Sequence, residues 1–274
     1  MTSIAVGVRF HTGGKIYHFD AANFPAVKKN DFVIVDTSRG QQLGQVALTL
    51  GPKEITKDQN WKPIIRKATP RDLVLRQVWE EKEEEALATC HEKAKGLVPS
   101  KIKFVSAEYS LNGEKLVFLY DYEGNEDPDL GKLIRAIEKV YPDTEVTMRR
   151  IGPRDAAKII GGMGVCGKEI RCCTEFMTNF QSISIKKAKI QGVSLVPSEI
   201  TGMCGRLRCC LNHEHELYVE AQKRLPKRGK RVVTPQGEGK VVRLSPLQGT
   251  VMVNLGEAGY QEFSWDEIKQ IKKK

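Results

Sequence analysis

Two near-copies of one cysteine motif constrain the folding of this chain more than any other feature of its sequence. The first copy spans residues 166–173 and reads Cys-Gly-Lys-Glu-Ile-Arg-Cys-Cys. The second copy spans residues 204–210 and reads Cys-Gly-Arg-Leu-Arg-Cys-Cys. Together they hold six of the seven cysteines in the 274 residues. A fold gains little from six clustered thiols on their own, so the motifs predict that something binds them.

The spacing of the cysteines helps to distinguish which metal or cofactor the six thiols bind. The chain does not open on a basic region followed by an apolar one, so we expect a cytoplasmic protein with reduced thiols rather than disulfides. Structural zinc sites usually use cysteines with two residues between them, whereas these motifs are C-x5-C-C and C-x4-C-C. Such spacings favour one or two 4Fe-4S clusters, each held by four thiolates, with zinc and unligated structural thiols as alternatives. The candidate ligands are Cys166, Cys172, Cys173, Cys204, Cys209 and Cys210.

Basic charge is concentrated around the same motifs. The net charge is +10, and residues 148–231 hold 17 Lys and Arg against 7 Asp and Glu, so the rest of the chain is balanced. Cations can offset an anionic thiolate cluster, and they can also bind the phosphates of RNA. The candidate contacts with nucleic acid or a partner are Arg149, Arg150, Arg154, Lys186, Lys187 and Lys189. Few aromatic residues are interleaved with them, which argues against a base-stacking platform.

The other motifs are weaker and favour no catalytic reading. Residues 162–167 fit G-x-G-x-x-G, but no clear βαβ unit surrounds them. Cys90 falls on the apolar stripe of an expected helix and is interpreted as a core residue. His213 and His215 are secondary ligand candidates, and the acidic run 80–85 is interpreted as a solvated helix face. Since neither a Ser-His-Asp set nor paired carboxylates stand out, no catalytic residue is predicted.

The expected fold class is α+β, in four segments. Residues 1–65 are expected to form a small β-barrel and residues 66–150 an α-β-β-α-β sandwich, with both helices on one face of an antiparallel sheet. Residues 151–226 are expected to be a Cys-rich, irregular and partly helical segment that binds the cluster, and residues 227–274 an SH3-like β-barrel. No apolar run is long enough to predict a transmembrane helix or direct membrane insertion.

Local signals place the elements of the sandwich. Thr69-Pro70 is typical of a helix start, and the apolar spacing carries that helix to about Lys95. Asn112-Gly113 predicts a tight hairpin turn. Asp127-Pro128 is expected to open a second helix, followed by a strand over Glu145–Arg150.

The paired motifs, together with three longer strings, resemble a known family. The strings are Ser-Ala-Glu-Tyr-Ser at 106–110, Arg-Arg-Ile-Gly-Pro-Arg-Asp at 149–155 and Gly-Gly-Met-Gly-Val-Cys-Gly at 161–167. Together with Gly-Met-Cys-Gly-Arg-Leu-Arg-Cys-Cys at 202–210, they resemble the bacterial RicT (YaaT) proteins, which carry the polymerase-suppressor-protein C-terminal domain. The resemblance covers most of the chain, and the C-terminal barrel is an extension that is not shared by every member.

The resemblance implies a cytoplasmic, non-catalytic regulatory subunit. In the family such a subunit joins two small helical Ric-type proteins, binds 4Fe-4S clusters and directs the membrane-bound endonuclease RNase Y in mRNA processing and decay. That regulation affects sporulation, competence and biofilm formation. Two other functions remain as alternatives: a zinc-stabilised nucleic-acid-binding module and an iron–sulfur redox enzyme.

Overall fold

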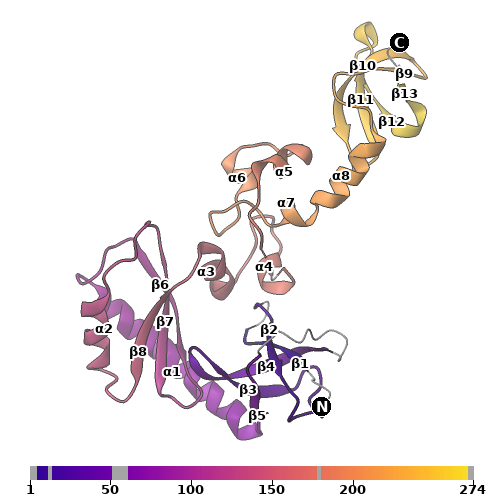
Figure 1. Cartoon of the computed structure of the whole chain (residues 1–274). Helices are drawn as coiled ribbons and strands as arrows, with labels where there is room; N and C mark the ends of the chain where they lie inside the picture. Colours follow the sequence, from indigo (N-terminus) through magenta and orange to yellow (C-terminus); the bar gives the residue numbers. More distant parts are fainter. Residues whose placement is uncertain (1–4, 12–13, 51–60, 178–179, 271–274) are drawn as a thin grey trace. The chain divides into compact units, whose positions relative to one another are not determined.

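The computed structural model describes residues 5–11, 14–50, 61–177 and 180–270 (Figure 1). The chain divides into two compact units. The first unit comprises Met1–Phe180 with Met203–Arg206, and the second comprises Gln181–Gly202 with Leu207–Lys274. Within the described residues, no helix is both long enough and apolar enough to cross a membrane.

The first unit begins with a curled, antiparallel five-stranded sheet. Its strands are β1 (Ala5–Arg9), β2 (Tyr17–Asp20), β3 (Phe32–Thr37), β4 (Gly40–Leu50) and β5 (Ile64–Lys67), in the order β2-β1-β4-β3-β5. The alternating apolar residues of these strands, Val6, Val8, Val33, Val35 and Val46 among them, form one buried cluster.

The N-terminal segment forms β-strands as expected, but the expected barrel is not confirmed. The two edge strands β2 and β5 share no ladder. A single parallel bridge joins Asp20 to Pro63, and the Asp20 N–H donates to the Lys62 carbonyl at 2.9 Å. The sheet is therefore a half-barrel whose edges approach each other at one point.

The sandwich follows in the expected order α-β-β-α-β. Its elements are α1 (Pro70–Ala94), β6 (Ile102–Tyr109), β7 (Lys115–Tyr122), α2 (Gly131–Glu138) and β8 (Glu145–Arg150), and the sheet order is β6-β7-β8. Both helices pack on one face of this sheet (Figure 1), in a cluster that includes Leu116, Phe118, Leu133 and Ile137. Cys90 is fully buried in the same cluster, and burial raises the pKa of its thiol to about 12, which confirms it as a core residue.

Two details of the sandwich differ from expectation. The sheet is mixed, because β8 pairs parallel to β7 after the chain crosses over through α2. Helix α2 begins at Gly131 rather than at Asp127-Pro128. The side chain of Asp129 accepts a hydrogen bond from the Gly131 N–H at 2.9 Å, which ends a non-helical turn before the helix starts.

The start of α1 is held by side chains that the sequence signal names. Pro70 occupies the first turn, and both the N–H and the hydroxyl of Thr69 donate to Asp72 at 2.7 Å. Arg66 of β5 binds both oxygens of the Asp72 carboxylate, at 2.6 and 2.7 Å, and holds its pKa well below the usual range. The helix start is thereby attached to the half-barrel.

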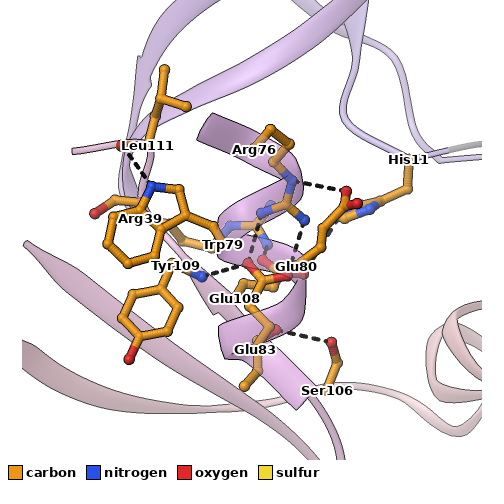
Figure 2. Close-up of polar contacts among 12 residues, drawn as sticks. His11, Arg39, Arg76, Trp79, Glu80, Glu83, Ser106, Glu108, Tyr109 and Leu111 are labelled. Carbon is orange, nitrogen blue, oxygen red and sulfur yellow. Dashed lines mark hydrogen bonds and ion pairs between the residues drawn. The ribbon is translucent and has the colours of Figure 1, made fainter. Parts of the chain in front are cut away.

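A buried ionic network joins the half-barrel to the sandwich (Figure 2). Arg76 of α1 binds both oxygens of Glu83 at 2.6 and 3.0 Å, and Glu83 also accepts the Tyr109 N–H at 2.7 Å. Glu108 of β6 pairs with Arg39 of the β3–β4 turn and with His11, whose Nε2 lies 3.4 Å from Glu108 Oε1.

Burial and the neighbouring charges compete at these two glutamates. Burial raises the pKa of Glu83 despite its pairing with Arg76. At Glu108, burial alone would raise the pKa, but His11, Arg39 and Arg76 outweigh it and the net pKa is lowered. Glu108 is therefore the carboxylate whose charge the network stabilises.

The second unit ends in a five-stranded antiparallel sheet. Its strands are β9 (Arg231–Thr234), β10 (Gly237–Ser245), β11 (Thr250–Asn254), β12 (Tyr260–Ser264) and β13 (Lys269–Gln270), in the order β12-β11-β10-β9-β13. Val232, Val241, Val251 and Val253 form its core together with Leu225 at the end of the preceding helix. The C-terminal segment is a β-sheet, but the expected SH3-like barrel is not confirmed.

Short helices occupy the Cys-rich segment, as the sequence predicted. They are α3 (Pro153–Ile160), α4 (Cys172–Glu175), α5 (Ile185–Ile190), α6 (Pro197–Ile200), α7 (Cys210–His213) and α8 (His215–Arg224). Residues 162–167 follow a helix rather than a strand, so they lack the strand–loop–helix setting of a dinucleotide site.

Replacing Glu108 with Gln should destabilise the protein, because the guanidinium of Arg39 then lacks its carboxylate in a largely buried position. We expect the free energy of unfolding, measured by urea denaturation at pH 7, to fall by about 3 kcal/mol. The matched control is Glu81→Gln, an exposed acid on α1, which should change stability by less than about 0.5 kcal/mol. The pKa of Glu108 in the folded protein lies below its ordinary value of 4.5. The charge of Glu108 therefore makes its full contribution to the free energy of unfolding above that pH. The difference between wild type and Glu108→Gln should therefore shrink as the pH falls through the folded pKa; a difference that grows in acid would contradict the assignment.

Candidate metal centre and neighbouring basic groove

The two cysteine motifs repeat as local structure as well as sequence. In each, the glycine after the leading cysteine has a left-handed backbone, with φ of 83° at Gly167 and 71° at Gly205. In each, the Cys-Cys pair lies at the start of a four-residue helix: Cys172 opens α4, and Cys209 precedes Cys210 at the start of α7. A helix that begins with proline, α3 or α6, precedes each motif.

The arginine before each Cys-Cys pair closes its loop through equivalent hydrogen bonds. Arg171 Nε donates to the carbonyl of Met163 at 3.1 Å, and Arg208 Nε donates to the carbonyl of Thr201 at 3.3 Å. Met163 and Thr201 each lie three positions before the leading cysteine of their motif. The leading cysteine and the Cys-Cys pair are therefore held at the two ends of a closed loop.

A second bond from each arginine reaches the preceding helix. Arg171 Nη1 donates to the carbonyl of Ala157 in α3 at 2.6 Å, and Arg208 Nη2 donates to the carbonyl of Ser198 in α6 at 2.9 Å. The planar guanidinium suits this role because it offers several donors in a fixed geometry. Both arginines donate to backbone carbonyls, so they hold the loops that carry the cysteines.

The thiols of the motifs are not joined in disulfides, and most are accessible. Cys166 is exposed, Cys173 is buried, and Cys172, Cys204, Cys209 and Cys210 are half-buried. Lys168 pairs with Glu175, and that contact raises the pKa of its ammonium, with the sulfurs of Cys172 and Cys166 acting in the same direction. A cation therefore lies close to two thiols of the first motif.

The six thiols are divided between the units. Cys166, Cys172, Cys173 and Cys204 belong to the first unit, and Cys209 and Cys210 to the second. Among the residues that the structure describes, no three His, Cys, Asp or Glu side chains converge as the ligands of a single metal ion do. The donor set fits an iron–sulfur cluster by its chemistry, since thiols on glycine-containing loops are what such a cluster takes.

The secondary ligand candidates lie next to the second motif. His213 ends α7 and His215 begins α8. The Nδ1 of His215 is buried and has no hydrogen-bond partner. Neither histidine belongs to a group of three potential ligands within the described part of the chain.

The six predicted basic contacts are divided between the two units. Arg149, Arg150 and Arg154 belong to the first unit. Arg150 is held by Asp127 at 2.9 Å and by the carbonyls of Tyr122 and Gly124, so it has a structural role. The guanidinium of Arg154 lies over the ring of Phe180, at 4.6 Å from its centroid. Arg149 is exposed on β8.

The three predicted lysines belong to α5 of the second unit. Lys186 is exposed, and Lys187 is half-buried and donates to the side chain of Asn212. Lys189 is exposed and lines an open groove of about 960 Å³ between α5, α8 and the β9–β13 sheet. We call this feature the basic groove, because its other charged residues are Arg228 and Arg243.

Sequence reasoning missed part of the basic groove and the loop-closing arginines. Tyr218 and Tyr260 also line the groove, and the side chain of Tyr260 is 65% exposed. Tyr260 lies outside residues 148–231, so the scarcity of aromatics within that segment gave no hint of it. The shared Arg-Cys-Cys ending of the two motifs was the available signal for Arg171 and Arg208.

Two segments of the chain match conserved regions of known proteins, and one known protein is similar to it over most of its length. Residues 62–151 match the PSP1 C-terminal conserved region, and residues 182–225 match the third domain of PSP1-like proteins. The chain is thus a PSP1-type protein, and its second cysteine motif lies within the latter match. The chain is 36% identical over 272 residues to the stage 0 sporulation protein YaaT of Bacillus subtilis (strain 168), covering 96% of this chain and 94% of that protein. It belongs to the YaaT family, as the sequence strings indicated. No solved structure matches the chain.

Replacing Arg171 with Ala should open the first cysteine loop, since two backbone bonds are lost. We expect amide hydrogen exchange in residues 163–173, followed by mass spectrometry, to become at least about 10-fold faster, because each bond contributes on the order of 1 kcal/mol to closure. Arg171→Lys should restore little of the protection, since one ammonium cannot copy the two-pronged contact. Glu169→Gln, at an exposed position in the same loop, is the control. Unchanged exchange in Arg171→Ala would refute the closing role.

Proposed function

We propose that the protein is a non-catalytic regulatory subunit that binds an iron–sulfur cluster through its duplicated cysteine loops. The observation that carries this proposal is the equivalent closure of the two loops by Arg171 and Arg208. The two loops differ in length, yet in both the arginine binds the carbonyl three positions before the leading cysteine. Such matched geometry is expected if selection acts on the positions of the thiols. Thiols that merely filled space would require no such matched geometry.

The first unit supplies a complete set of ligands by number. A 4Fe-4S cluster takes four thiolates, and Cys166, Cys172, Cys173 and Cys204 all belong to that unit. When bound, the cluster supplies a redox-sensitive, anionic centre. Lys168 lies near two of these sulfurs and offsets part of that charge. Cys209 and Cys210 then remain for a second cluster or for a site shared with a partner.

The biological setting follows from the family rather than from the site. The relative from Bacillus subtilis is named a stage 0 sporulation protein, and we propose a regulatory role of that kind here. We further propose that the chain joins two small helical Ric-type proteins and directs an RNase Y-type endonuclease in mRNA processing and decay in the cytoplasm. Competence and biofilm formation would be affected through the same RNA targets.

The basic groove supports contact with RNA. Lys189, Arg228 and Arg243 provide positive charge, and Tyr218 and Tyr260 provide aromatic faces for unpaired bases. Electrostatic attraction of this kind positions a strand without reading its sequence. The groove would therefore hold a substrate near a partner enzyme rather than select it.

Protein purified without oxygen should be brown and should contain iron and acid-labile sulfide. Cys204→Ala should lower the iron content by more than half, because it removes one of the four thiols of the first unit. Cys90→Ala is the matched control: its thiol is buried in the core of the sandwich, so iron should be retained while stability falls by about 1 kcal/mol. Stoichiometric zinc without iron would favour the zinc-stabilised alternative, and iron loss in Cys90→Ala equal to that in Cys204→Ala would contradict the ligand assignment.

Charge reversal in the basic groove should weaken RNA binding without changing the iron content. For Lys189→Glu/Arg243→Glu we expect at least a 10-fold weaker affinity for a fluorescent single-stranded RNA at about 0.1 M salt, and a shallower dependence on salt. Lys240→Glu, at an exposed position on the same strand as Arg243 but outside the groove, is the control and should have a smaller effect. RNA incubated with the pure protein should stay intact; metal-dependent cleavage abolished by one point mutation would instead indicate an enzyme.

A further inference from the structure

A second groove lies in the first unit, on the acidic side of α1. It has a volume of about 550 Å³ and is bounded by α1, the β6–β7 turn and the segment that follows α2. Its aromatic walls are Trp79, Tyr109 and Tyr141, and its acidic residues are Glu85, Glu114 and Asp143. We call it the Trp79 groove. None of its residues belongs to the cysteine motifs or to the basic groove.

The aromatic wall of the Trp79 groove is rigid before anything binds. Trp79 stacks on Tyr109, with ring centroids 4.8 Å apart and planes 27° apart. The indole N–H donates to the Leu111 carbonyl at 3.0 Å (Figure 2). Gly113, at φ +75°, lets the hairpin turn approach the ring so closely that a Cβ there would lie 2.7 Å from it. Folding has therefore already fixed the orientation of Trp79, so binding a ligand to this face costs little additional conformational entropy.

The exposed side of Trp79 already attracts a cation. The ammonium of Lys82 lies over the indole ring, 4.7 Å from its centroid. Lys82 is one turn along α1 from Trp79 and is itself exposed. A cationic ligand can therefore displace it at a small cost in free energy. A tryptophan face is the strongest aromatic partner for a cation.

The charged residues around the groove favour a positively charged ligand. Glu85, Glu114 and Asp143 are exposed at the groove, and Lys82 is the one basic residue among its described lining residues. An RNA strand would bring phosphates towards these carboxylates and be repelled. A guanidinium suits the site better than an ammonium, because it stacks flat on an indole and binds carboxylates through paired donors.

We propose that the Trp79 groove binds an arginine side chain from an extended basic segment of a partner protein. The guanidinium stacks on Trp79 in the position that the Lys82 ammonium occupies, and its donors face Glu85 and Asp143. The aliphatic parts of the segment's side chains pack against Tyr141 and Pro142. This surface is independent of the cluster and of RNA, so it gives the subunit a separate docking point for a protein.

The test uses the full-length protein with ¹⁵N-labelled tryptophan. The chain has three tryptophans, and the Trp79 indole N–H signal is assigned by its loss in Trp79→Phe. The probe is the capped peptide Gly-Arg-Gly-Arg-Gly, and the control peptide carries citrulline, the neutral isostere, at both arginine positions. We expect the Trp79 signal to shift and saturate with the arginine peptide, at least 10-fold more tightly than with citrulline, while the signals of Trp61 and Trp265 stay in place.

Two matched variants test the acidic rim. Glu85→Gln should weaken the arginine peptide by about 3-fold or more, whereas Glu84→Gln, at an exposed position on the same helix outside the groove, should leave the affinity unchanged. Three outcomes would overturn the proposal: no shift of the Trp79 signal, equal binding of both peptides, or equal effects of the two variants. A shift of the Trp79 signal produced by a single-stranded RNA of ten nucleotides would also overturn it, in favour of a nucleic-acid site.

Discussion

The pairing of Glu108 with Arg39 is the interaction on which the first unit depends. The two residues are 69 positions apart, one on β6 and the other in the turn between β3 and β4. Both are largely removed from water, so the loss of Glu108 would leave the charge of Arg39 buried without its carboxylate. The half-barrel and the sandwich have separate apolar clusters, and they are joined by charged pairs such as this one and by the hydrogen bond from the Leu111 N–H to the Gln41 carbonyl at 2.7 Å.

Elements with local signals were predictable from the sequence. Thr69-Pro70 placed the start of α1, and Asn112-Gly113 placed the hairpin turn, because each signal depends on residues within one turn. The parallel pairing of β8 was not predictable, since it depends on which side of β7 the chain returns to after α2. The closure of the N-terminal barrel failed for the same reason: strand patterns identify strands, but pairing of β2 with β5 depends on residues far apart in the chain.

The candidate site shows the same division between local and distant information. Cysteine spacing identified the candidate ligands, because thiol chemistry is visible in the sequence. The role of Arg171 and Arg208 was hidden, because their partners are backbone carbonyls, and a carbonyl has no residue identity to recognise. The basic groove was only partly visible, since Lys189 and Arg243 are brought together by folding. Side chains that act on the backbone or across elements thus remain outside the reach of motif reasoning.

The unequal length of the two cysteine loops has a consequence for recognising distant relatives. Three residues separate Gly167 from Arg171, but two separate Gly205 from Arg208. Each arginine nonetheless reaches the carbonyl three positions before its leading cysteine, so the extra residue is absorbed between the glycine and the arginine. A search profile that demands a fixed interval between cysteines would reject true members, whereas one that requires Arg-Cys-Cys and allows a gap of variable length would retain them.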